Sequence, residues 1–254
     1  MNEEELLERA KEVALRAGEA ILAHYGTHEF TQKSDRSPLT LADKASHELI
    51  TRELGETYPV FSEEAILPYE ERKDFARFWL VDPLDGTKEF LAQNGEFVVS
   101  IALIEHQRPI LGVLYAPVSG DLYYARRGAG AHKNTQPLKN TRARHLNSAL
   151  LSRSHKDSEF ESFCAKHNFS ALHVGSALKF AILSEGRAGI YPRFHGSSTW
   201  DIAAGDIILK ESGGIVIDLV TKKEPLYNQE SHRNNHFIAF SPEVFRRGIK
   251  KFFT

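Results

Sequence analysis

The stretch WLVDPLDGTKEF, residues 79–90, joins an apolar run to two aspartates that lie three positions apart. Residues 79–81 have the bulk and apolar character of a buried strand. We expect Asp82 to be the last residue of that strand, because Pro83 fixes its own φ and lacks an N–H donor. The chain then turns, so Asp85 can point back to the place where Asp82 points.

Oxygen atoms are therefore expected to converge at this strand end. The two carboxylates repel each other, and the Leu84 carbonyl is left without a regular strand partner. A hard cation such as Mg²⁺ offsets the repulsion, because it binds carboxylate, carbonyl and water oxygens. Gly86 and Thr87 can open a helix whose N–H groups face the same point, where a phosphate oxygen can dock.

A metal-free turn is the competing interpretation of the same residues. In that case Asp82 is an Asx-turn residue and Asp85 is a helix N-cap. A calcium loop of the EF-hand type is excluded, because it needs acidic residues at every second position. This stretch alone leaves the metal site and the turn about equally supported.

Two further acidic motifs favour the metal site. FSEEA places Glu63 and Glu64 directly after a short apolar run, and STWDIAAGD places Asp201 at the start of an apolar helix. Alone, Glu63 is an ordinary solvated loop charge and Asp201 an ordinary helix cap. Three acidic motifs at strand or helix ends together indicate a site for two metal ions.

Composition limits the classes of function. The 254 residues are 41% hydrophobic and carry a net charge of −2, so no basic surface for a nucleic-acid polymer is expected. The single cysteine, Cys164, is typical of a reducing compartment. No secretory signal and no apolar run of membrane-spanning length is found. We expect a cytoplasmic protein, at most peripheral to a membrane.

The hydrophobic pattern predicts an α/β protein with two different halves. Helices are expected over 3–25 and 41–54, and short strands over 60–62 and 78–81. The runs 97–106 and 109–117 have the spacing of an antiparallel hairpin, which a further run extends to a meander. After a polar stretch at 132–145, strands and helices alternate, which is typical of layered α/β structure. We therefore expect one domain, 1–254, with subdomains of about 1–140 and 141–254.

The motifs FSEE, WLVDPLDGTKEF and WDIAAGD, in this order, resemble the inositol monophosphatase superfamily of Mg²⁺-dependent, lithium-sensitive phosphatases. DGTKEF, NGEF, ALLSRSH, GSALKF and YPRF further resemble the bacterial 3′(2′),5′-bisphosphate nucleotidases of that superfamily. The resemblance extends from the first helix to about Phe240. It implies a layered αβαβα sandwich with the active site between its halves.

The resemblance also implies the metal ligands. Glu63, Asp82 and the Leu84 carbonyl are expected to hold one Mg²⁺. Asp82, Asp85 and Asp201 are expected to hold a second, so that Asp82 bridges the two ions.

A catalytic pair follows from the same resemblance. The Thr87 hydroxyl is expected to relay a proton from the attacking water to Asp43, in the stretch SPLTLADKAS. The alternative for Asp43 is structural, because Thr40 and Asp43 have the spacing of a helix capping box. The resemblance favours the catalytic role.

Contacts to the nucleotide are expected mainly from the second half. Arginine suits phosphate as a bidentate donor and lysine as a point charge. Taken singly, each candidate is an ordinary surface charge or helix cap. The resemblance assigns substrate contacts to His155, Ser176, Lys179 and Arg193, and also to Glu63, Gly86, Thr87 and Asp201.

The expected activity is hydrolysis of adenosine 3′,5′-bisphosphate (PAP) to AMP and phosphate, with its sulfated relative PAPS as a second substrate. The expected partner is thus a small nucleotide bisphosphate, and the sequence carries no signal for an oligomeric state. One alternative is an inositol or sugar monophosphatase with the same metal site. The other is a non-catalytic nucleotide-binding protein.

Overall fold

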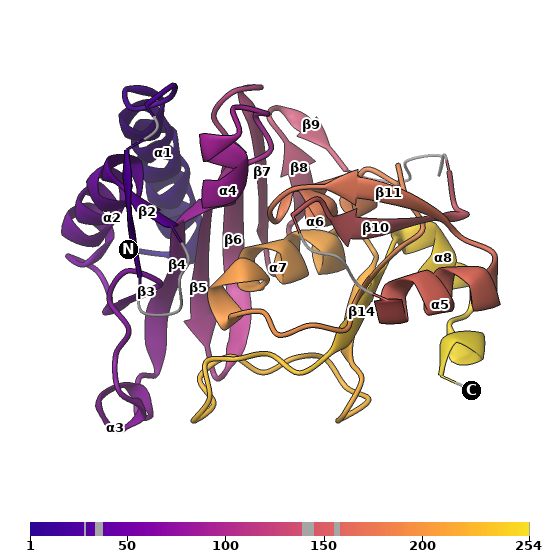
Figure 1. Cartoon of the computed structure of the whole chain (residues 1–254). Coiled ribbons are helices and arrows are strands. Elements are labelled where there is room, and N and C mark those ends of the chain that lie inside the picture. The colour runs from indigo at the N-terminus through magenta and orange to yellow at the C-terminus, as the bar shows by residue number, and fades with distance from the viewer. Residues whose placement is uncertain (28, 34–37, 139–144, 155–157, 254) are drawn as a thin grey trace.

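The protein is a sandwich of five layers in which helices and sheets alternate (Figure 1). This computed structural model describes residues 1–27, 29–33, 38–138, 145–154 and 158–253. Helices α1 (Glu3–Leu22) and α2 (Leu41–Leu54) cover a seven-stranded sheet, and α6 (Leu178–Ser184) and α7 (Ala203–Glu211) cover its other face. Beyond them lie a five-stranded sheet and an outer layer with α5 (Ser158–His167) and α8 (Pro242–Arg247). The expected αβαβα fold is confirmed.

Helix α1 begins where the sequence predicts. Asn2 Oδ1 accepts a hydrogen bond from the Glu5 backbone N–H at 3.0 Å, and the Glu5 carboxylate accepts one from the Asn2 N–H at 2.8 Å. This reciprocal capping box satisfies two N–H groups that the helix itself leaves free. The apolar face, which includes Ala10 and Val13, is buried against the first sheet. The helix ends at Leu22, three residues earlier than expected.

The first sheet is the expected antiparallel meander, with one parallel strand at its edge. β3 (Val60–Ser62) pairs in parallel with β4 (Arg77–Asp85), and all later neighbours are antiparallel in chain order. The later strands are β5 (Val98–Glu105), β6 (Arg108–Ala116), β7 (Asp121–Arg126), β8 (Gly130–Lys133) and β9 (Gln136–Pro137).

Strand β4 corrects one expectation, because it does not end at Asp82. It continues to Asp85, and its pairing with β5 shifts register between these two aspartates. Pro83 has no N–H to give to the ladder, so the chain bulges there instead of leaving the sheet. The bulge holds both aspartates at the C-terminal end of a strand that lies between β3 and β5.

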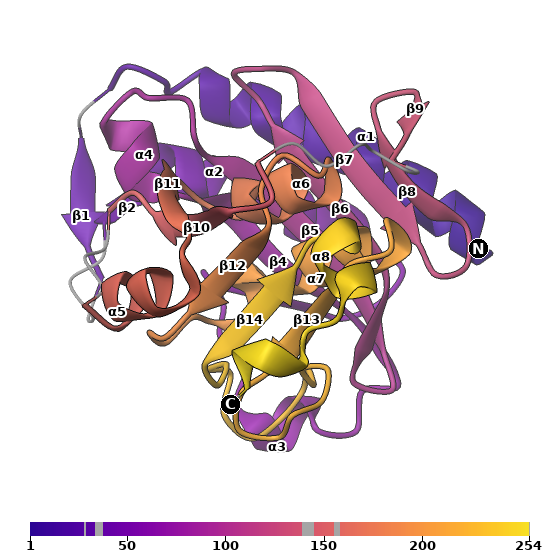
Figure 2. The same cartoon turned by 90° about the vertical axis from the view of Figure 1, so that its right-hand side faces the viewer.

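The second sheet has mixed pairing and the order β11-β10-β12-β14-β13. β10 is parallel to both β11 and β12, whereas β14 is antiparallel to β12 and β13. The strands are β10 (Ser148–Ser152), β11 (Ser170–Val174), β12 (Ile190–Arg193), β13 (Ile215–Asp218) and β14 (Phe237–Phe240). Figure 2 shows β12, β13 and β14 of this sheet in front of α7.

The middle helices join the two sheets into one core. A Cβ atom at Gly112 of β6 would lie 2.6 Å from Ile207 Cγ2 and 2.8 Å from the Ala204 carbonyl oxygen. Helix α7 therefore lies directly on the first sheet, while α6 and α7 also face the second. The division near residue 140 stays a prediction, although one sheet lies on each side of it.

Short elements complete the chain. The 3-10 turn η1 (Thr199–Asp201) precedes α7, so Asp201 lies two residues before the helix that was expected to start with it. The remaining elements are β1 (Phe30–Gln32), β2 (Pro38–Thr40), α3 (Tyr69–Arg72), α4 (Thr87–Leu91) and η2 (Lys250–Phe252). Among the described residues, none of the helices has both the length and the apolar character to span a membrane.

Candidate active site

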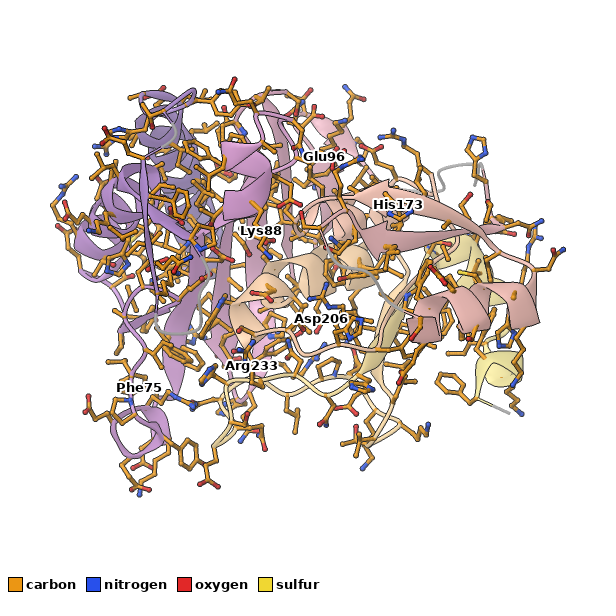
Figure 3. All side chains as sticks on the ribbon, in the orientation of Figure 1. Phe75, Lys88, Glu96, His173, Asp206 and Arg233 are labelled. Carbon is orange, nitrogen blue, oxygen red and sulfur yellow. The ribbon has the colours of Figure 1, made fainter. Side chains whose placement is uncertain are left out.

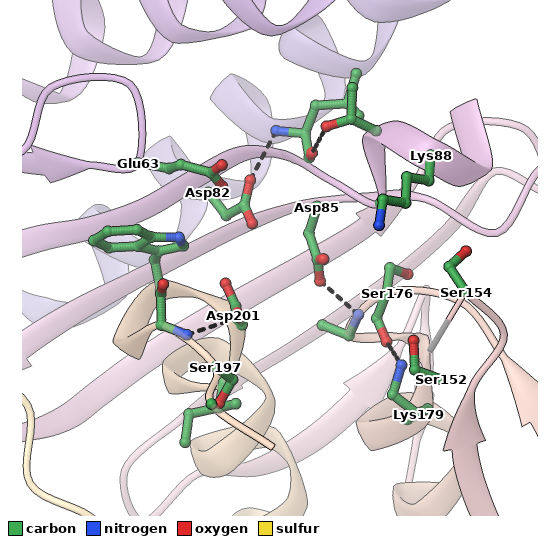
Figure 4. Close-up of a pocket in the computed structure, with 18 of the residues that line it drawn as sticks. Glu63, Asp82, Asp85, Lys88, Ser152, Ser154, Ser176, Lys179, Ser197 and Asp201 are labelled. Carbon is green, nitrogen blue, oxygen red and sulfur yellow. Dashed lines mark hydrogen bonds between the residues drawn. The ribbon is translucent and has the colours of Figure 1, made fainter. Parts of the chain in front are cut away.

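A cavity of about 490 Å³ opens where the bulge of β4 meets η1 and the start of α6. Its walls come from both halves of the chain, so it lies between them as expected. Figure 4 shows this cavity with the acidic residues on one side and Lys88, Ser176 and Lys179 on the other.

Three carboxylates meet on the acidic side. Glu63 follows β3, Asp82 lies in β4 and Asp201 in η1, and one oxygen of each lies within 4.8 Å of the others. Asp82 is 2% exposed. We call these three residues the acidic triad, and the sequence predicted all of them.

Burial and mutual repulsion make the acidic triad unfavourable without a counter-charge. Burial, followed by the charges of Glu63, Asp85 and Asp201, raises the pKa of Asp82 well above its usual value. Burial and the charge of Glu63 raise the pKa of Asp201 to about 6. A divalent cation fits this set, because it favours the ionised carboxylates and takes oxygen ligands.

Both interpretations of Asp82 hold at once. Its Oδ1 accepts a hydrogen bond of 3.1 Å from the Leu84 N–H, which is the bond of an Asx-turn. Its carboxylate still belongs to the acidic triad. The Leu84 carbonyl borders the cavity and lies 3.4 Å from the Thr87 hydroxyl, and its role as a metal ligand stays a prediction.

Asp85 lies beside the acidic triad and is held from the second half of the chain. Its Oδ2 accepts a hydrogen bond of 2.6 Å from the Ala177 N–H (Figure 4). Burial and the charge of Asp201 raise the pKa of Asp85 to about 8, with Lys179 acting in the opposite direction. Its place in a second metal site stays a prediction.

Asp43 and Thr87 are in contact, as the resemblance implies. Thr87 Oγ1 donates to Asp43 Oδ1 at 3.2 Å. The capping box of α2 is also present, because Asp43 Oδ2 accepts hydrogen bonds from the N–H and hydroxyl of Thr40. The two alternatives for Asp43 are therefore compatible, and its catalytic role stays a prediction.

Ser46 supports the same loop, and sequence analysis missed it. It lies one turn after Asp43 on α2, is fully buried, and donates a hydrogen bond of 2.7 Å to the Pro83 carbonyl. The β4 bulge leaves this carbonyl without a ladder partner, so Ser46 supplies one. The spacing of Asp43 and Ser46 places both on one helix face, which was the available signal.

Lys33 is a second residue that sequence analysis missed. Its ammonium lies 2.6 Å from a carboxylate oxygen of Glu63 and 2.6 Å from one of Glu64. Burial alone would lower the pKa of Lys33, but these two carboxylates raise it above its usual value. The lysine thus holds positive charge against Glu63 beside the acidic triad.

The side of the cavity opposite the acidic triad is formed around a strained turn. Ser176 has a φ of 48°, a left-handed conformation that is uncommon for a serine. Lys179 is 3% exposed, and its ammonium donates hydrogen bonds to the carbonyls of Val174, at 3.1 Å, and of Ser176. Burial lowers the pKa of Lys179 to about 8, although Asp85 acts to raise it. Lys179 stabilises this turn, and its contact with a nucleotide stays a prediction.

The other expected anion binders differ in position. Arg193 borders the cavity and donates to the Gly196 carbonyl at 3.4 Å. Arg153, the arginine of the stretch ALLSRSH, forms an ion pair of 2.6 Å with Glu96. His155 lies outside the described residues. Arg233, which the sequence did not indicate, borders the cavity near Asp201.

Comparison with known proteins gives consistent results. A sequence profile of the inositol monophosphatase family matches residues 2–244. The chain is 41% identical over 241 residues to the 3′(2′),5′-bisphosphate nucleotidase CysQ of Salmonella typhimurium, covering 91% of this chain and 98% of that protein. The CysQ protein of Haemophilus influenzae is 31% identical over 257 residues, with 95% of each chain covered.

Solved structures agree with these relatives. The crystal structure of CysQ from Bacteroides thetaiotaomicron, described as a bacterial member of the inositol monophosphatase family, superimposes with a TM-score of 0.85 at 36% identity. The match covers 94% of this chain and 97% of that one. An inositol monophosphatase from Thermotoga maritima gives a TM-score of 0.82 at 25% identity, with 98% of this chain and 96% of that one covered.

Proposed function

The chain belongs to the inositol monophosphatase family and is a phosphatase, and from that premise we propose that it hydrolyses adenosine 3′,5′-bisphosphate to AMP and phosphate. One observation carries the proposal. The relatives are named 3′(2′),5′-bisphosphate nucleotidase, and the cavity has the acidic triad at one side and cationic groups at the other, as a phosphate substrate requires. PAPS, which carries the same 3′-phosphate, is a proposed second substrate. The proposed cellular role is to recycle the by-product of sulfate activation.

The proposed cofactor is Mg²⁺, held by the acidic triad with the Leu84 carbonyl and Asp85. When bound, the metal supplies charge that stabilises the phosphate in the transition state and lowers the pKa of a water molecule. Oxygen is the only donor type in this set, which suits magnesium better than a metal that prefers sulfur or nitrogen.

The chain itself positions and deprotonates the water in this proposal. The Thr87 hydroxyl donates its hydrogen to Asp43, so a lone pair of its oxygen is free to accept a hydrogen bond from water. As the water oxygen forms its bond to phosphorus, the bond from phosphorus to the 3′-oxygen breaks, and the 3′-oxygen takes a proton from solvent to become the 3′-hydroxyl of AMP. One proton passes from the water through Thr87 toward Asp43, which is within general-base reach.

A single assay tests the proposed function. Phosphate release is measured from PAP, inositol 1-phosphate and fructose 1,6-bisphosphate, each with Mg²⁺ and with chelator. We expect the highest kcat/KM on PAP, and only with the metal. Higher efficiency on inositol 1-phosphate would instead support the monophosphatase alternative, and PAP binding without any phosphate release would support the non-catalytic one.

A further inference from the structure

Lys88 is a cation in the cavity with no acidic partner. It lies in the first turn of α4, is exposed, and extends its amine between Asp85 and Ser176 (Figure 4). In the part of the chain that the structure describes, no carboxylate lies within ion-pair distance of it. Its neighbour Glu89 is engaged by Ser154, whose hydroxyl donates to it at 2.6 Å. The charge of Lys88 is therefore available to a ligand.

The other cations around the cavity are already engaged. Lys33 is paired with Glu63 and Glu64, and Lys179 donates to two backbone carbonyls. Arg193 donates a hydrogen bond to the Gly196 carbonyl and Arg233 donates one to the Ser198 hydroxyl, both at 3.4 Å. Each of these four cations thus has a partner within the protein.

The backbone that precedes Lys88 is closely packed. Gly86, directly before α4, has a φ of 99°, and a Cβ there would lie 3.2 Å from both the Glu96 carbonyl oxygen and Ser176 Cβ. The start of α4 is thus packed against the turn that carries Ser176. Because Thr87 follows Gly86, the proposed catalytic hydroxyl and the Lys88 amine extend from adjacent residues of one rigid segment.

The substrate needs a cation at such a place. In adenosine 3′,5′-bisphosphate, the two phosphates are attached to C3′ and C5′, which are both bonded to C4′ of the same ribose. When the 3′-phosphate lies at the acidic triad, the 5′-phosphate must therefore lie in the same cavity. A phosphate dianion there requires a positive charge that no carboxylate already offsets.

We propose that Lys88 binds the 5′-phosphate and gives the enzyme its preference for a bisphosphate over a monophosphate. The inference rests on the proposed function and adds a specificity residue to it. Figure 3 shows Lys88 and Arg233 on opposite sides of the start of α7. Arg233, which also borders the cavity, is therefore the alternative cation for binding the 5′-phosphate.

The test compares two nucleotides that differ only in the 5′-phosphate, namely adenosine 3′,5′-bisphosphate and adenosine 3′-monophosphate. We expect Lys88→Met to lower kcat/KM for the bisphosphate by about 10- to 150-fold, the range for one charge-assisted hydrogen bond. The loss should lie mainly in KM. Efficiency on the monophosphate should change by less than about threefold, and Lys88→Arg should restore most of the efficiency on the bisphosphate.

Inhibition by products gives a second readout. AMP retains the 5′-phosphate, so its inhibition constant should rise in Lys88→Met, whereas that of inorganic phosphate should stay the same. The matched control is Lys223→Met, because Lys223 is also exposed and lies outside the active-site cavity. Lys223→Met should leave kcat/KM for both nucleotides unchanged, and also the inhibition constants of AMP and inorganic phosphate.

The possible outcomes separate the two proposals. A wild-type enzyme that releases no phosphate from the bisphosphate would overturn the proposed function, whereas one that is equally efficient on both nucleotides would overturn only the role of Lys88. A wild-type preference that Lys88→Met leaves intact would overturn only the role of Lys88. If Arg233→Gln lowers kcat/KM for the bisphosphate alone and Lys88→Met does not, the role of Lys88 would also be overturned. The 5′-phosphate would then be assigned to Arg233.

Discussion

Thr87 donates a hydrogen bond of 3.2 Å to Oδ1 of Asp43, while Oδ2 of the same carboxylate caps helix α2 through Thr40. The buried Asp43 side chain thus connects the start of α4 to the start of α2. Burial raises the pKa of Asp43 above its usual value, and the hydrogen bonds from Thr40 act in the other direction. The cap fixes the orientation of the carboxylate whose Oδ1 accepts the hydrogen bond from Thr87.

The first prediction concerns this pair. Asp43→Asn and Thr87→Val should each lower kcat by about 10²–10⁴-fold, the usual contribution of a general base, with little change in KM. The asparagine retains one capping oxygen, so the melting temperature should fall only slightly. Steady-state kinetics and thermal unfolding measure the two effects.

The double variant decides whether the two residues act together. If both act on one water, Asp43→Asn combined with Thr87→Val should be little worse than the slower single variant. Losses that multiply would indicate that Asp43 serves only as the helix cap.

Ser46 offers a test of how the β4 bulge is supported. Ser46→Ala leaves the buried Pro83 carbonyl without its donor, which should cost about 1–3 kcal/mol of stability. It should also weaken Mg²⁺ binding, because Asp82 and Leu84 flank that carbonyl. Denaturant unfolding and calorimetric titration with Mg²⁺ measure these changes.

Ser184 provides the matched control for Ser46. It is also fully buried, but its hydroxyl has no hydrogen-bond partner among the described residues. Ser184→Ala should therefore be neutral or slightly stabilising, with unchanged metal affinity. Equal losses in both serine variants would mean that the Pro83 contact contributes nothing specific.

Asp82→Asn should abolish turnover without unfolding the protein. Asp82 is the most buried member of the acidic triad, and its charge is opposed by Glu63, Asp85 and Asp201. Removing that charge relieves repulsion, so the melting temperature without metal should stay the same or rise. Asp74→Asn, at an exposed site outside the cavity, is the control. Near-normal activity of Asp82→Asn at millimolar Mg²⁺ would contradict the metal assignment.

The stability of the metal-free protein should fall as pH rises from about 5 to 8. Asp201 and Asp85 have folded-state pKa values of about 6 and about 8, above the 3.8 of an ordinary aspartate. A group whose pKa is raised on folding stabilises the protein fully below its unfolded pKa, and this contribution is lost as pH passes the folded value. The ionised carboxylates bind Mg²⁺, so the melting-temperature increase caused by Mg²⁺ should grow over the same interval.

Thermal unfolding at several pH values, with EDTA or with Mg²⁺, measures this dependence. The interval from pH 5 to 8 excludes the titration of carboxylates such as Glu96 and Glu105, because their pKa values are lowered. Asp201→Asn should reduce the change of the metal-free melting temperature with pH near pH 6. A metal-free melting temperature that does not vary between pH 5 and 8 would contradict the prediction.

The sequence predicted elements whose signals are local. Helix α2 and strand β3 have the expected bounds, because an N-cap, a glycine stop and short apolar runs are all readable within a few residues. The acidic triad was also predicted, since each of its members lies beside a short apolar run that is visible in the sequence. The cytoplasmic location stays a prediction.

Contacts between distant segments could not be predicted in the same way. The bond from Ser46 to Pro83 joins residues 37 positions apart, and the pairing of Lys33 with Glu63 joins residues 30 apart. The spacing of Asp43 and Ser46 indicates the helix face on which Ser46 lies, but no pattern in the sequence identifies either partner, because each contact depends on how helix, loop and sheet pack. The bulge in β4 was missed because proline usually ends a strand, and only pairing with β5 on both sides of it keeps the strand intact.

Lys179 differs from Lys88 in burial, and this difference gives the last prediction. The buried ammonium holds the turn whose Ala177 N–H binds Asp85, and its charge lowers the pKa of Asp85. Lys179→Met should therefore raise that pKa and lower the affinity for Mg²⁺ at neutral pH. The resulting loss in kcat/KM should be similar for PAP and for adenosine 3′-monophosphate.

The pH dependence of Lys179→Met distinguishes this role from direct binding of a second phosphate. Lys179 itself has a pKa of about 8, so the wild-type enzyme loses the charge above that pH as well. The difference in Mg²⁺ affinity between the two proteins should thus be largest below pH 8 and shrink above it, as measured by calorimetric titration. If the loss instead falls on the bisphosphate alone, with Mg²⁺ affinity unchanged, then Lys179 contacts the nucleotide directly, as the sequence resemblance implies.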